Sequence, residues 1–131
     1  MAEWQLMGFG KLMGFKLIQR SPERSEAELV VREELCNRRG VMHGGAVMGW
    51  ADTMGGMTAS AGLAQGQATA TIESKTNFFV GVPVGDVARA QCTPLHRGRT
   101  TMVWQTKVTR DDGRLCALVT QTQIVIPAAE K

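Results

Sequence analysis

A single carboxylate stands in a stretch of the sequence that otherwise carries no formal charge. Between Val41 and Ala64 that carboxylate, Asp52, is surrounded mainly by Gly, Ala and Met. Removing a carboxylate from water is costly unless it is paired and hydrogen-bonded. An isolated carboxylate in such a segment therefore indicates a function. Just upstream, residues 37–45 read Asn-Arg-Arg-Gly-Val-Met-His-Gly-Gly and form a compact polar group. Together the two features predict an active site built around the start of a buried helix.

The pair Gly44 and Gly45 lies where this helix is expected to begin. A helix N-terminus presents unpaired backbone N–H groups and a partial positive charge, and glycine lets a carbonyl group approach them closely. Such amides can hold the oxyanion of an acyl-transfer reaction. Asp52 follows Gly44 by eight residues, which is about 12 Å along one helix. Because that is too far for both to act on one carbonyl carbon, the chemistry predicts a site shared between two antiparallel helices of a dimer.

The segment from Gly44 to about Leu63 contains no proline and is long enough for such a helix. Helical spacing places Asp52 and three glycines on one face, a stripe made up of Gly45, Gly49, Asp52 and Gly56. Glycine weakens a helix, so several on one stripe indicate that another backbone or a ligand lies against it. We therefore expect Asp52 to point into that stripe and away from open solvent.

Strand-like runs flank the helix on both sides. Residues 13–20 and 26–35 are expected to pair as a hairpin, the second with the period-two alternation of a half-buried strand. After the helix, four more runs are expected as an antiparallel meander, at 69–80, 87–96, 100–110 and 115–126.

These elements predict one α+β domain over residues 1–131. A helix that is apolar around its circumference must be covered on most sides. A curved antiparallel sheet wrapped around one long central helix does this with a single layer of each kind.

The composition narrows the class of partner. A net charge of +3 and a pI near 9.0 fit an anionic ligand or a nucleic acid and do not choose between them. The three Trp and four Phe are not interleaved with Arg and Lys as in a single-strand nucleic-acid binder. Two His without metal-ligand spacing predict no metal site. Asp52 argues against a membrane span, because a charge at mid-helix costs roughly 2.5–3.5 kcal/mol.

The cysteines and the N-terminus favour a cytoplasmic location. Three cysteines without a CxxC pair, at Cys36, Cys92 and Cys116, predict free thiols in a reducing compartment. The first six residues lack the basic and apolar regions of a secretory signal.

The spacing Asn-x-x-Gly-x-x-His-Gly-Gly, followed by Asp nine residues after the His, resembles the acyl-CoA thioesterases of the hotdog fold, and most closely their PaaI-like branch from phenylacetate metabolism. Here the motif is carried by Asn37, Gly40, His43, Gly44, Gly45 and Asp52. The likeness extends from residue 12 to residue 126, with the same order of strands.

The resemblance implies a thioester hydrolase that uses no cofactor, since a thioester carbonyl is already activated. Asp52 would be the catalytic carboxylate, acting as general base or as nucleophile, and the Gly44 N–H would polarise the carbonyl. Asn37 and His43 would orient the thioester and water. Relatives place a Ser or Thr on the first strand after the helix to assist the carboxylate, and Thr71 holds that place here.

The resemblance also implies the partners. Gly45, Arg97 and Arg99 are candidates for binding an acyl-CoA substrate, the two arginines because their hairpin resembles the one near which such enzymes hold the CoA nucleotide. The protein is expected to form a homodimer or a homotetramer.

Other interpretations of the same residues stay open. Asp52 could pair with a distant arginine, His43 could only cap the helix, the two glycines could serve only the turn, and Arg97 and Arg99 could be solvated hairpin charges. The fold could instead serve a dehydratase acting on enoyl or 3-hydroxyacyl substrates, or a non-catalytic acyl-CoA-binding module. The acyl group and the choice between dimer and tetramer also stay open.

Overall fold

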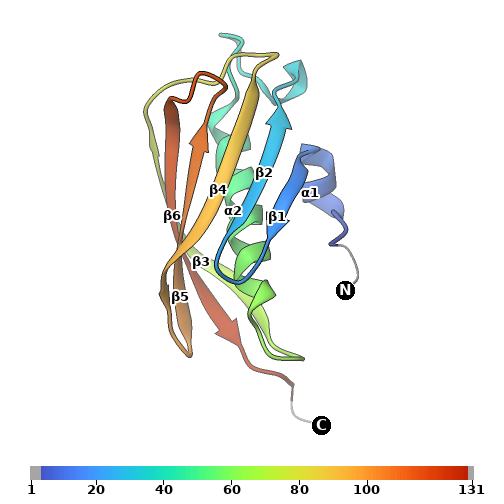
Figure 1. The fold of residues 1–131 in the computed structure, drawn as a ribbon, viewed down its shortest axis with the longest axis vertical. Coiled ribbons are helices and arrows are strands. Elements are labelled where there is room, and N and C mark those ends of the chain that lie inside the picture. Colours follow the sequence, from blue (N-terminus) through green and yellow to red (C-terminus); the bar gives the residue numbers. More distant parts are fainter. Residues whose placement is uncertain (1–3, 130–131) are drawn as a thin grey trace.

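The computed structural model describes residues 4–129, which form two α-helices, a short 3-10 turn and six strands (Figure 1). In chain order these are α1 (Gly8–Met13), β1 (Lys16–Arg20), β2 (Ser25–Val30), η1 (Glu33–Leu35), α2 (Gly44–Ala61), β3 (Ala68–Phe78), β4 (Val87–Arg97), β5 (Thr101–Thr109) and β6 (Leu115–Ile126).

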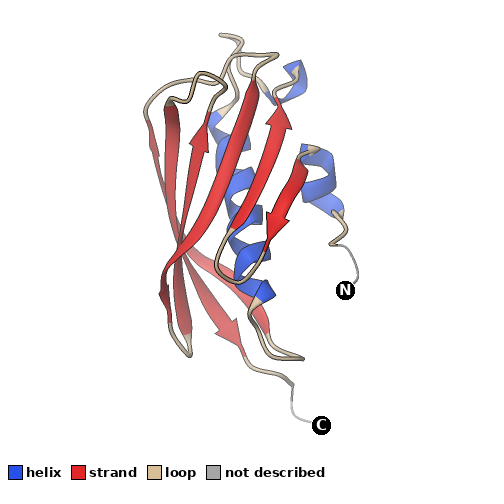
Figure 2. Cartoon of the chain, viewed as in Figure 1, coloured by secondary structure: helices blue, strands red, loops and turns tan. Residues whose placement is uncertain are grey.

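All six strands join one antiparallel sheet in the order β1-β2-β4-β5-β6-β3. Figure 2 shows the sheet twisting strongly, with α2 lying along one of its faces. The predicted α+β class, a curved antiparallel sheet around one long central helix, is confirmed. The 18 residues of α2 agree with the helix predicted from residue 44.

The predicted meander is wrong for β3, which pairs with β6 and not with the next strand, β4. Both edges of β4 are already occupied, by β2 on one side and by β5 on the other. The strand that follows α2 therefore takes the open edge of β6, and residues 79–86 carry the chain across to β4. This leaves β3 at the edge of the sheet.

The N-terminal third also differs from the prediction. The hairpin of β1 and β2 is confirmed, but β2 ends at Val30 and the chain turns through η1, so residues 31–35 are not strand. The helix α1 is not among the elements expected from the sequence; it precedes β1 and ends at Gly14, which has a left-handed φ of 75°. Because Gly14 can adopt this conformation without strain, the chain reverses there into β1.

The core lies between α2 and the concave face of the sheet. Trp50 of α2 and Trp104 of β5 are almost completely buried, and the Trp50 ring packs against Phe15, with the ring centroids 6.2 Å apart. The opposite face of α2 is left uncovered by residues 4–129, since Met48 and Asp52 are exposed. A single chain therefore buries one side of a helix whose sequence predicts cover on most sides.

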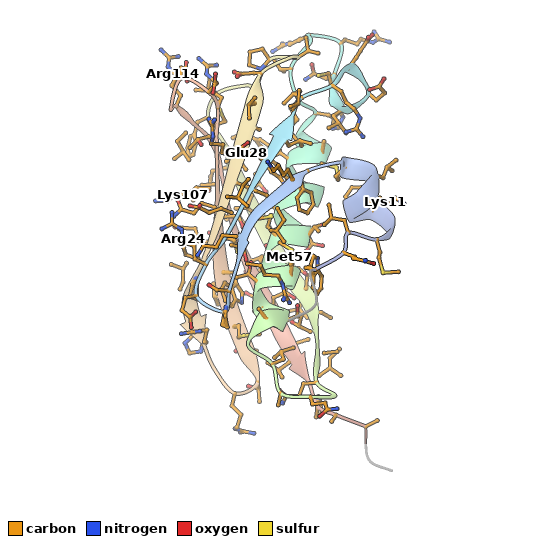
Figure 3. The ribbon with its side chains drawn as sticks, turned by 45° about the vertical axis from the view of Figure 1, so that its right-hand side comes forward. Lys11, Arg24, Glu28, Met57, Lys107 and Arg114 are labelled. Carbon is orange, nitrogen blue, oxygen red and sulfur yellow. The ribbon has the colours of Figure 1, made fainter. Side chains whose placement is uncertain are left out.

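The other face of the sheet carries charge. Arg24, Glu28 and Lys107 project from it, away from α2 (Figure 3), and Arg89 pairs there with Glu28 and Asp111. No helix within residues 4–129 has the length and hydropathy that crossing a membrane requires.

Candidate active site

The N-terminus of α2 is capped by His43. Its backbone is extended, with φ −60° and ψ 137°, and its Nδ1 accepts a hydrogen bond from the N–H of Gly45 at 2.8 Å. Because Nδ1 accepts, the proton of the neutral ring lies on Nε2. His43 thus does cap the helix, and it keeps an exposed Nε2–H that could donate to a ligand. The Gly45 N–H, a candidate for substrate binding, is already engaged.

The backbone N–H of Gly44 is different, because it donates no hydrogen bond to any described residue. It is the first amide of α2, where the helix offers no internal acceptor. The Phe78 ring lies close by, and a Cβ at position 44 would be 3.2 Å from its Cζ. Gly44 therefore combines an unengaged amide with a backbone that a side chain would crowd.

A pocket of about 290 Å³ opens beside this amide. Its lining is mainly apolar and consists of Asn37, Val41, Met42, Gly44, Val47, Phe78, Phe79, Val80, Gly81, Val82 and Cys116. The structure thus brings Asn37 and Gly44 to one site. Asn37 Oδ1 accepts hydrogen bonds from the N–H groups of Arg39 and Val41, at 2.9 and 3.4 Å, so the loop engages the amide oxygen of Asn37.

Cys116 lines the same pocket but is not suited to nucleophilic attack. Burial raises the pKa of its thiol above the ordinary value, so it stays protonated at neutral pH. All three cysteines are free thiols, as predicted.

Asp52 lies farther along α2, where it faces β3 and β6. Its Oδ1 accepts two hydrogen bonds, from the hydroxyl of Thr71 at 2.5 Å and from Nε2 of Gln121 at 3.2 Å. Among residues 4–129 no arginine or lysine forms an ion pair with it. The expectation that Asp52 points away from solvent is wrong for the single chain, because its side chain is exposed.

Two glutamines of β6 complete the surroundings of Asp52, and neither is among the site residues expected from the sequence. Gln121 and Gln123 are 0% and 1% exposed, and Gln123 Nε2 donates to the Thr71 hydroxyl at 2.6 Å. They continue the buried alternation that begins with Ala117 and Val119. The signal in the sequence is that two glutamines occupy positions of this strand at which the alternation places buried apolar side chains.

Gly55 explains how Gln121 reaches Asp52. A Cβ on Gly55 would lie only 2.2 Å from Oε1 of Gln121. The side-chain amide of Gln121 can therefore pack against α2 only because residue 55 has no side chain. The predicted stripe is only partly correct, since the Phe9 ring lies against Gly49, where a Cβ would be 2.8 Å from it, and not a backbone or a ligand. Gly56 has open space beside it.

Arg97 and Arg99 lie at the other end of the molecule, around a second pocket of about 270 Å³ near the C-terminus of α2. Arg97 pairs with Glu23 at 3.6 Å and donates to the Pro22 carbonyl, and Arg99 is exposed. Within one chain the candidate residues therefore fall into three groups: the pocket at the start of α2, the network around Asp52, and the arginine pocket.

Residues 39–117 match the family model described as Thioesterase superfamily. In sequence, the chain is 34% identical to the proofreading thioesterase EntH of Klebsiella pneumoniae, over 70% of this chain and 66% of that protein. In structure, it superposes on a thioesterase of Haemophilus influenzae with a TM-score of 0.84 and 27% identity, over 90% of this chain and 82% of the other. The PaaI protein of E. coli shares the fold, with a TM-score of 0.82, 21% identity and coverage of 91% and 84%.

Proposed function

Because the chain belongs to the thioesterase superfamily, and is thus a thioester hydrolase, we propose that it cleaves an acyl- or aryl-CoA thioester to the free acid and CoA. The observation that carries this proposal is the arrangement on α2. Asp52 is held by two hydrogen bonds through one oxygen, and the first amide of the same helix, at Gly44, has no partner among the described residues.

In the proposed reaction the thioester carbonyl oxygen accepts a hydrogen bond from the Gly44 N–H. Asp52 either removes a proton from the water that attacks the carbonyl carbon or attacks it directly, in which case water then hydrolyses the acyl-enzyme. The C–S bond breaks, and the CoA sulfur leaves and takes up a proton. In the general-base route the water oxygen becomes part of the free acid, whereas in the direct route water attacks the Asp52 carbon of the mixed anhydride, so that Asp52 keeps the water oxygen and the acid leaves with the oxygen that attacked. A positioned base contributes about 10²–10⁴-fold and an oxyanion donor about 10²–10³-fold.

Neighbouring residues would orient the substrate. Asn37 lines the pocket beside Gly44, where its amide nitrogen could hold the thioester. The Nε2–H of His43, at the same end of α2, could donate to the leaving sulfur. The arginine pocket of Arg97 and Arg99 offers positive charge for the phosphates of CoA.

The proposed site requires two chains, because Gly44 and Asp52 are about 12 Å apart along one helix. Two features support a second copy. The edge strand β3 has a free edge of 11 residues, and all of them except Thr69 and Thr76 are exposed. Such an edge is a template for another strand. The uncovered face of α2, which carries Asp52, lies next to this edge strand, because α2 packs against β3.

Gly56 gives a test of this dimer. Among the residues that the structure describes, nothing lies within 4 Å of a Cβ at this position, so Gly56→Leu is expected to fold and to stabilise the helix. If a partner helix packs there, the leucine overpacks the interface at a cost of about 1–3 kcal/mol. We expect the dimer dissociation constant to rise about tenfold to a hundredfold, as measured by analytical ultracentrifugation, with loss of activity at low protein concentration. Ala64→Leu, at an exposed position just beyond α2, is the control; an unchanged constant for Gly56→Leu would contradict this packing.

The function itself is tested by following thiol release from a panel of aryl- and alkyl-CoA esters. Turnover of at least one of them to free acid and CoA is the expected result. A dehydratase would act only on enoyl- or 3-hydroxyacyl-CoA without releasing thiol, and a binding module would bind acyl-CoA without turnover, so either outcome would contradict the proposal.

A further inference from the structure

A directed chain of hydrogen bonds runs through the sheet to Asp52. Gln123 Nε2 donates to the Thr71 hydroxyl at 2.6 Å, and that hydroxyl donates to Asp52 Oδ1 at 2.5 Å. An amide nitrogen can only donate, and a hydroxyl has one proton. With Gln123 donating to its oxygen, Thr71 directs its single proton to the carboxylate. The Thr69 hydroxyl lies 3.0 Å from Oε1 of Gln123 and also 3.0 Å from the Ile124 carbonyl, so it can hold this amide in that orientation.

The second glutamine acts on the same oxygen of Asp52. Gln121 Nε2 donates to Oδ1 at 3.2 Å, and no described residue donates to Oδ2. The two donors therefore engage one oxygen and leave the other free, which fixes the plane in which the free oxygen can meet water or a carbonyl carbon.

The burial of Gln121 indicates that its amide is kept for a purpose. The side chain is fully buried, and its Oε1 has no hydrogen-bond partner among the described residues. An unsatisfied buried acceptor destabilises the fold, and a leucine or methionine would fill this place without that cost. What the amide provides in return is its N–H, which points at Asp52.

A bulge in β3 aims Thr71 at this network. The pairing of β3 with β6 places Thr71 opposite Gln123, and the register shifts immediately afterwards, between Thr71 and Glu73. Bulges re-aim a side chain locally and are frequent beside active sites. The side chains that surround Asp52 therefore come from β3 and β6, two strands that are far apart in the sequence and are brought together by their pairing.

We infer that Gln121 and Gln123 are positioning residues for thioester hydrolysis: Gln123 fixes the proton of Thr71, and both glutamines, one through Thr71 and one directly, hold Asp52 by Oδ1 so that Oδ2 is the reactive oxygen. This inference rests on the proposed function, in which Asp52 is the catalytic carboxylate.

The test replaces each glutamine with methionine, which has a similar shape and no donor. Gln121→Met loses a hydrogen bond to the charged carboxylate, and Gln123→Met loses the one that orients the Thr71 donor to it. Each loss is expected to lower kcat about tenfold to a hundredfold. KM should change by less than about twofold, because neither amide is proposed to contact substrate. Gln105→Met is the matched control, since Gln105 is a half-buried glutamine of β5 with no hydrogen bond to this network, and its kcat should not change.

A double-mutant cycle separates positioning from a general effect on the fold. Because Gln123 acts through Thr71, Gln123→Met should have almost no effect on kcat in a Thr71→Val background. Gln121 reaches Asp52 directly, so Gln121→Met should still lower kcat in that background. Equal effects of Gln123→Met in both backgrounds would overturn the role assigned to it.

The same assay distinguishes failure of this inference from failure of the proposed function. If Asp52→Asn is inactive while both methionine variants, folded and dimeric by circular dichroism and size-exclusion chromatography, keep wild-type kcat, only the inference is wrong. If Asp52→Asn keeps wild-type activity, the proposed function of Asp52 is wrong, and the inference fails with it. If one variant does not fold, the other decides, since each glutamine has its own hydrogen bond to test.

Discussion

Asp52→Asn is expected to lower kcat for thioester hydrolysis by about 10²–10⁴-fold, the contribution of a positioned base. The reason is chemical and not structural, because the asparagine oxygen can still accept the hydrogen bonds that Thr71 and Gln121 now donate to Oδ1. An amide can neither remove a proton from water nor attack a thioester. The fold, the proposed dimer and the proposed affinity for CoA should therefore be unchanged. Steady-state kinetics with circular dichroism as the control provide the measurement.

A variant that kept a tenth or more of wild-type kcat would contradict the role of Asp52. With the active enzyme, a single turnover in ¹⁸O-labelled water then separates the two forms of the mechanism. Label in the Asp52 carboxylate shows direct attack, followed by attack of water on the Asp52 carbon of the mixed anhydride, whereas general-base catalysis places the label only in the product acid.

Gly44→Pro is expected to have the next largest effect, lowering kcat by about 10²–10³-fold through loss of one oxyanion donor. Proline is well tolerated at the first position of a helix, which Gly44 occupies in α2. The extended backbone of His43, with φ −60° and ψ 137°, is also what a residue before proline prefers. The substitution thus removes the free N–H while keeping the helix start.

Gly44→Ala is the matched control for this variant. It adds a Cβ at the same distance from the Phe78 ring, 3.2 Å, but keeps the N–H. A small loss of kcat for alanine and a large one for proline would assign the effect to the amide. Similar losses for both variants would assign it to crowding against Phe78 instead, and would contradict the role of the amide.

Local sequence patterns predict well those elements whose structure depends mainly on residues that are close in the sequence. The long proline-free segment predicts α2, and the strand-like runs at 100–110 and 115–126 predict the antiparallel pair of β5 and β6, which the structure contains. The predictions that fail concern elements that depend on distant partners or that are very short. The edge position of β3 follows from β4 being paired on both sides, and α1 is only six residues long and ends at a glycine.

The residues of the candidate site also divide into those that a local sequence pattern predicts and those that it does not. Asp52 and Thr71, both proposed from the sequence, do meet in the structure, and Asn37 and Gly44 line one pocket. Gln121 and Gln123 lie some seventy and fifty residues from the groups they bind, so no local spacing relates them. Only the register of β3 against β6, with its bulge, brings them together.

Mixing two inactive variants tests most directly whether one thioester is cleaved between two chains. When Asp52→Asn and Gly44→Pro dimers exchange subunits, each mixed dimer holds one intact pair, the glycine amide of the first chain and the carboxylate of the second. Random exchange should restore about a quarter of wild-type activity. If the mixture stays as inactive as its parents although mass spectrometry detects mixed dimers, the two groups do not act on one substrate across the interface.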